Sequence, residues 1–158
     1  MRKDGSPVNR RRIFTIGLFA LTVILSSCAT KKPVLYGPEG DPFSITQYEK
    51  IAQMEREAGR YENAVEVYRV IIERFEENRT SLVWAHYETG FCYFKLKKYN
   101  EAEVQFRRVI NEFQDPAARK LAQDMLTRIA ELKEDKVKKN KMKEKIDKKM
   151  EKQTKKKP

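Results

Sequence analysis

The sequence predicts an all-α fold made of repeated helical hairpins, and two observations predict it. Residues 59–71 align with residues 97–109 at an offset of 38 residues, and Ala64 of the first segment matches Ala102 of the second. Apolar residues in these two segments and in residues 117–132 recur every three or four positions, which is the spacing of one helix face. Self-similarity at a fixed period is typical of arrays in which each unit packs on its neighbour.

The repeated segments resemble the tetratricopeptide repeat, a helix-turn-helix unit of about 34 residues. Its signature positions hold Tyr48, Ile51, Ala52, Gly59, Tyr61, Ala64, Tyr68 and Ile71 in the first unit, and Ala85, Tyr87, Gly90, Tyr93, Tyr99, Ala102 and Phe106 in the second. His86 and Thr89 replace the usual tryptophan and leucine. The resemblance implies repeats at about 45–78 and 83–116 in a right-handed superhelix. Extra residues fit a loop near 76–81.

A third helix follows the repeats and is expected to cap them. Asp115 precedes Pro116, and an acidic N-cap followed by proline is a common helix start. We expect this cap helix at 117–132, which completes a domain of residues 45–132. Two and a half repeats are marginal for the stability of an array, so a partner or self-association would stabilise the domain.

The C-terminal segment, residues 133–158, is a lysine-rich tail. It holds 13 lysines and five acidic residues, a net charge of +8. Pairs such as Glu134–Lys138, Asp135–Lys139 and Glu144–Lys148 have the i,i+4 spacing that supports a helix. Few apolar residues are available for a core, so we expect either a frayed helix or a disordered tail. The tail is either a solvated extension without a binding role or a segment that binds anionic cell wall or lipid.

The N-terminal segment, residues 1–27, has the pattern of an export signal. Arginines at 10–12 precede a run without charges over residues 13–25, which is short for a membrane span. The run ends in Leu25-Ser26-Ser27-Cys28, which resembles the bacterial lipobox. The resemblance implies that Cys28 carries a covalent lipid and becomes the mature N-terminus; the alternative is an uncleaved anchor helix.

Cleavage before Cys28 would leave residues 28–44 as a linker, because proline and glycine recur there. Ala29 follows the cysteine, and by the enterobacterial sorting rule this implies the outer membrane. The expected location is therefore the periplasmic face of a membrane.

The charge distribution argues against nucleic-acid binding. The formal net charge is +11, but residues 28–132 hold 16 basic and 17 acidic residues, so the excess belongs to the two ends. No phosphate-binding glycine loop, nucleophile elbow or zinc motif occurs. We therefore expect no enzyme activity, no metal and no cofactor beyond the lipid. His86 is predicted to be packed, and Cys92 to be a buried, inert thiol.

The family resemblance places a partner-binding groove on the first helix of each repeat. In the second unit the groove positions are Trp84, Tyr87, Phe91, Phe94 and Lys95. The aromatic residues are spaced by 3, 4 and 3 and therefore share one helical stripe. In the first unit the same positions hold polar residues, namely Thr46, Glu49, Gln53, Arg56 and Glu57. The alternative is that the stripe is ordinary core, covered by a neighbouring helix.

Together these features indicate a non-enzymatic, lipid-anchored scaffold that binds other envelope proteins. The combination of lipobox and repeats resembles the lipoprotein subunits of outer-membrane β-barrel assembly machines, which have about twice as many repeats. Two alternatives remain: a pilotin-like helper of a secretion or pilus system, and a structural envelope protein whose basic tail binds the cell wall.

Overall fold

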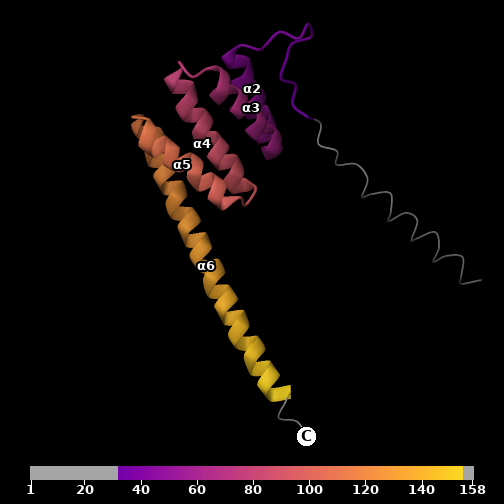
Figure 1. The fold of residues 1–158 in the computed structure, drawn as a ribbon, viewed down its shortest axis with the longest axis vertical. Helices are drawn as coiled ribbons and strands as arrows, with labels where there is room; N and C mark the ends of the chain where they lie inside the picture. The colour runs from indigo at the N-terminus through magenta and orange to yellow at the C-terminus, as the bar shows by residue number, and fades with distance from the viewer. Residues whose placement is uncertain (1–31, 155–158) are drawn as a thin grey trace, which may run out of the picture. The chain divides into compact units, whose positions relative to one another are not determined.

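The computed structural model describes residues 32–154. From Ile45 onward the chain forms consecutive helices that pack as antiparallel hairpins (Figure 1). The helices are α2 (Ile45–Glu57), α3 (Tyr61–Arg74), α4 (Arg79–Lys95), α5 (Tyr99–Glu112) and α6 (Pro116–Thr154). Each packs on the next in the chain, and α6 also contacts α4. The predicted all-α array of two helical hairpins and a further helix is confirmed.

The turn inside each hairpin has the same backbone geometry in both repeats. Gly59, just beyond the end of α2, has φ of 74°, and Lys97, 38 positions later and just beyond the end of α4, has φ of 60°. The next N–H groups, of Arg60 and Lys98, donate to the carbonyls of Glu55 and Tyr93, each at 2.9 Å. This closure satisfies carbonyls that the last helical turn leaves open. The left-handed conformation suits glycine but costs energy at Lys97.

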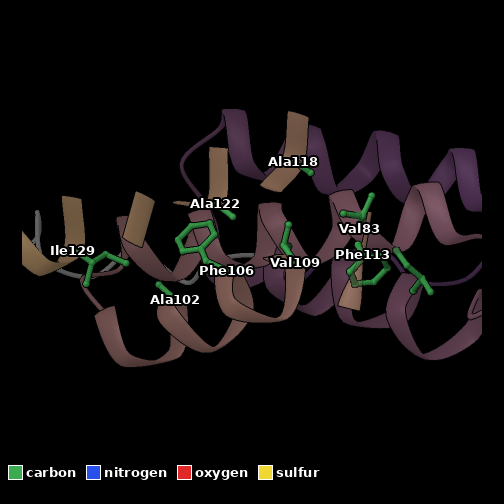
Figure 2. Packing of buried hydrophobic residues seen from close by; sticks show 9 residues of the cluster. Val83, Ala102, Phe106, Val109, Phe113, Ala118, Ala122 and Ile129 are labelled. Carbon is green, nitrogen blue, oxygen red and sulfur yellow. The ribbon is translucent and has the colours of Figure 1, made fainter. Parts of the chain in front are cut away.

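The second repeat is built around Phe106, which is completely buried on α5 and lies among the labelled side chains of Figure 2. Its ring lies against Gly90 of α4, where an added Cβ would lie 2.9 Å from Cε1 of the ring. Ala118 and Ala122 of α6 belong to the same core cluster. Small residues therefore let α4 and α6 approach α5 closely, as the repeat pattern predicts for Gly90.

The last helix starts as predicted but does not end at residue 132. The backbone N–H of Ala118 donates to the Asp115 carboxylate at 2.7 Å, which caps the helix. Beyond the core, Lys133 donates to Asn100 and Glu103 of α5, each at 2.8 Å. The helix then runs to Thr154. Lysine and glutamate are good helix formers, and two of the expected i,i+4 ion pairs form, Glu134–Lys138 and Glu144–Lys148. Of the two expected states of the tail, the structure has the helix.

Part of the predicted linker packs on the first repeat. A turn closes with the N–H of Gly37 donating to the Asp41 carbonyl at 2.8 Å, and Tyr36 forms a β-bridge with Pro42. Leu35 and Phe43 on either side of the turn pack against the core of the first repeat. Within the predicted linker of residues 28–44, residues 35–43 therefore form a turn that contacts the first repeat through the partly buried side chains of Leu35 and Phe43.

Candidate functional site

A groove lies between the first helices of the two repeats, α2 and α4, with α3 behind it. Its volume is about 240 Å³. It is lined by Glu49, Gln53 and Arg56 of α2, Tyr68 and Ile71 of α3, and Ser81, Trp84, Ala85 and Glu88 of α4. The groove therefore has two large aromatic side chains, Trp84 and Tyr68, among polar and charged neighbours.

An ion pair crosses the groove and joins its two walls. Arg56 Nε lies 3.3 Å from Glu88 Oε2, and both side chains are about three-quarters covered. Burial raises the pKa of Glu88, and the Arg56 charge offsets part of this effect. Burial also raises the pKa of the Tyr68 hydroxyl, which the Arg56 charge opposes. A partly desolvated charge pair costs free energy, so it favours a ligand that supplies further hydrogen bonds.

A second polar contact connects the walls at the other end of the groove. The Ser81 hydroxyl donates to Glu49 Oε1 at 2.6 Å. Glu49, Gln53 and Arg56 are three of the five positions that the sequence predicted for the first unit. They line the same groove as Trp84, so the first helices of both repeats contribute to it.

The structure divides the predicted aromatic stripe. Trp84 lines the groove, and its ring meets that of Tyr87 edge to face at 5.8 Å. Tyr87 in turn lies 5.6 Å from the ring of Phe106, so it connects the groove to the core. Both are only partly buried.

The remaining stripe residues lie further along α4. Phe91 is partly buried and has the Lys95 ammonium 5.3 Å from its ring centre, while Lys95 itself is exposed. Phe94 packs on Tyr99 of α5 within the α4–α5 hairpin, and the centroids of the two rings are 5.8 Å apart. Of the five positions predicted in the second unit, Trp84 is thus the one that lines the groove.

The sequence interpretation missed Tyr68, Ser81 and Glu88 as groove residues. Glu88 could have been found, because it follows Trp84 by one helical turn and therefore shares its side of α4. Tyr68 was assigned only to packing, since nothing in its spacing shows that it lines the same groove as Arg56, which lies on another helix.

His86 and Cys92 of α4 are buried, as expected. His86 is 4% exposed, and its Nδ1 lies 2.9 Å from Gln105 Oε1. Burial lowers the pKa of His86 although this hydrogen bond acts in the opposite direction. Cys92 is fully buried, and burial raises the pKa of its thiol to about 12. A thiol that does not ionise near neutral pH is a poor nucleophile.

Cys28, the predicted lipid attachment site, lies outside the described residues. Among residues 32–154, no group of three or more histidine, cysteine, aspartate or glutamate side chains could hold a metal ion. In the same part of the chain, no helix is both long and apolar enough to cross a membrane.

Comparison with known proteins gives one positive finding. A family model for the tetratricopeptide repeat matches residues 48–78 and 84–116. No curated protein and no solved structure matches the chain. The two matched segments coincide with the α2–α3 and α4–α5 hairpins, including the groove between them. These two segments, which together make up less than half of the chain, are therefore similar to the tetratricopeptide repeat.

Proposed function

We propose that the chain is a non-enzymatic scaffold that binds a segment of a partner protein in the groove between α2 and α4. The observation that carries the proposal is the position of Trp84, a partly buried aromatic side chain in a groove lined with charged groups. Tryptophan is over-represented among residues that dominate binding energy. Glu49, Arg56 and Glu88 provide acceptors and donors for the polar atoms of a bound segment.

The size of the groove limits what it can hold. A volume of about 240 Å³ lies below the range of about 300–1,000 Å³ usual for small-molecule sites. It has room for one or two side chains of a protein that lies across the two helices. The repeats thus supply a surface for a protein segment, in keeping with the general role of this repeat in protein–protein interaction.

Crosslinking in cells tests the groove. A photo-crosslinking amino acid at Gln53, an exposed groove position, should capture a partner, and Trp84→Ala should abolish that product. Truncating a hot-spot aromatic typically weakens binding by about 2 kcal/mol or more. The matched position is Val104, which is 57% exposed on α5 and does not line the groove. Equal products from both positions, or a Gln53 product that survives Trp84→Ala, would contradict the proposal.

The rest of the stripe is tested by comparing stability with binding. Tyr87→Ala should lower both, because Tyr87 contacts Phe106 as well as Trp84. Phe91→Ala should affect the fold less, since the Phe91 ring faces the ammonium group of the exposed Lys95. If Phe91→Ala leaves the Gln53 product unchanged, the partner does not extend along the stripe.

We further propose that the scaffold is held at the envelope through a lipid on Cys28. The support is the sequence Leu25-Ser26-Ser27-Cys28 after an uncharged run, and several acyl chains would anchor a protein firmly. In cells, Cys28→Ala should accumulate as an unprocessed form and lose lipid labelling. Cys92→Ala, the matched control at a buried thiol, should be processed normally. Normal processing of both variants would refute the lipid anchor.

The identity of the crosslinked partner separates the system-level proposals. Capture of outer-membrane assembly components supports the first role, in outer-membrane protein assembly. Capture of secretion or pilus components supports the pilotin-like role. The structural role, in which the basic tail binds the cell wall, requires the tail rather than the groove.

A further inference from the structure

The distal part of α6, residues 136–152, carries apolar side chains that nothing in the described chain covers. Met142, Ile146 and Met150 are 65%, 51% and 60% exposed. Their spacing of i, i+4 and i+8 aligns them along one line of the helix. They form a continuous apolar stripe beyond the point where α6 leaves the core at Ile129 and Lys133.

The carboxylates of this segment are arranged asymmetrically around the stripe. At about 100° per residue, Lys139, Lys143 and Lys149 fall within about 60° of Ile146. The acidic residues of the same segment, Glu144, Asp147 and Glu151, fall at about 100° or more from it. The Glu144–Lys148 ion pair, 2.6 Å long, lies on that opposite side. The stripe is thus bordered by lysines, and the carboxylates lie away from it.

We propose that this surface docks along a lipid bilayer that contains anionic headgroups. An interfacial helix places its apolar face at the boundary of headgroups and acyl chains, with lysines directed to the phosphates. The stripe would enter that boundary, and the bordering lysines would reach anionic headgroups. The carboxylates would face water, away from the negative surface.

Other occupants fit the surface less well. A second copy of α6 packed on the stripe would bring Lys139 and Lys143 close to the same residues of its partner, which is unfavourable for like charges. A cell-wall polyanion would pair with the lysines and leave the stripe in water. The proposal refines the role of the basic tail and is independent of the groove, so either can fail alone.

A local fluorescent reporter tests the docking in the full chain. Trp84→Phe removes the only tryptophan, and Ile146→Trp places a new one in the stripe. Vesicles of phosphatidylcholine with phosphatidylglycerol should shift its emission to the blue, and brominated acyl chains should quench it. Added salt should reverse both effects. Vesicles of phosphatidylcholine alone should leave the emission of this tryptophan unchanged.

Val104→Trp in the same background is the matched reporter, since Val104 is exposed on α5 away from the stripe; it should respond to neither vesicle. Vesicle binding by the N-terminal segment alone would leave the Ile146→Trp emission unchanged and would overturn the proposal. An equal response to both vesicle types would also overturn it.

A triple substitution measures the contribution of the stripe. Met142→Ser, Ile146→Ser and Met150→Ser together should weaken the salt-sensitive binding of the full chain to anionic vesicles by about tenfold or more. The control is Met54→Ser, Val104→Ser and Leu121→Ser, three exposed apolar residues elsewhere, which should bind like the parent. If the stripe variant loses self-association and keeps vesicle binding, the occupant is a second copy and the proposal is wrong.

Discussion

Gly90→Ala should destabilise the protein, although alanine is normally the better helix former. The new Cβ would lie 2.9 Å from Phe106 Cε1 and 3.1 Å from both Cδ1 and Cζ. The ring cannot withdraw freely, because Phe106 is fully buried and also faces Tyr87. Crowding of this kind typically costs about 1–3 kcal/mol, while the change from glycine to alanine in a helix gains about 1 kcal/mol.

The expected net loss is about 1 kcal/mol, which lowers the Tm of a domain this size by about 4–8 °C. Thermal unfolding followed by circular dichroism measures it. The decisive comparison repeats the substitution in a Phe106→Leu background. Leucine lacks the ring atoms Cε1 and Cζ, so the crowding is relieved and Gly90→Ala should become neutral or stabilising.

The double-mutant cycle therefore predicts that the effect of Gly90→Ala on the Tm changes sign between the two backgrounds. A general loss of helix packing would not produce this change of sign. If Gly90→Ala raises the Tm in the parent protein, the close approach of α4 and α5 does not need glycine. If it lowers the Tm equally in both backgrounds, the ring of Phe106 is not the cause.

Four other features of the structure can be tested by substitution, labelling or deletion. Lys97→Gly should raise the free energy of unfolding by about 0.5–1 kcal/mol, measured by urea titration, because φ at this position is 60°. Cys92 should resist alkylation in the native chain near pH 8 and react once urea unfolds it; rapid native labelling would contradict the pKa of about 12. Deleting residues 134–158 while keeping Lys133 should leave the Tm within about 5 °C of the parent, since the removed ion pairs are exposed. The pKa of Glu88 is raised in the folded state, so the folded state binds this proton more tightly than the unfolded state. The resulting stability is present below pH 4.5 and is lost as the pH rises through the folded pKa. The Tm of the parent relative to Glu88→Gln should therefore fall over that pH range, and a constant difference in Tm would refute the raised pKa.

The helices were predictable because their signals are local. The alignment of Ala64 with Ala102 fixed the hairpins, and Asp115 before Pro116 marked the start of α6 where the structure has the cap. The end of α6 was not predictable from its few apolar residues. Its continuation depends on helix propensity and side-chain pairs, and the core does not require it.

The segment at 35–43 shows what composition alone cannot reveal. Proline and glycine indicated a linker, yet the Tyr48 hydroxyl donates to the Leu35 carbonyl at 2.8 Å, and the Phe43 and Tyr48 rings meet at 5.6 Å. These contacts join parts of the chain that no helical or strand period connects. The groove has the same limitation. Helical spacing put Trp84 on a stripe, but which neighbours it faces depends on how α2, α3 and α4 pack.

The packed turn at 35–43 also limits the reach of a tether that would begin at Cys28, if Cys28 carries the proposed lipid. Between Cys28 and Leu35 lie seven peptide steps, which span at most about 25 Å when fully extended. Had the whole stretch to residue 44 been free, the limit would be about twice as long. If Cys28 bears the proposed lipid, the tether keeps the first repeat within about one bilayer thickness of the headgroups. A partner would then have to come to the membrane surface to reach the groove.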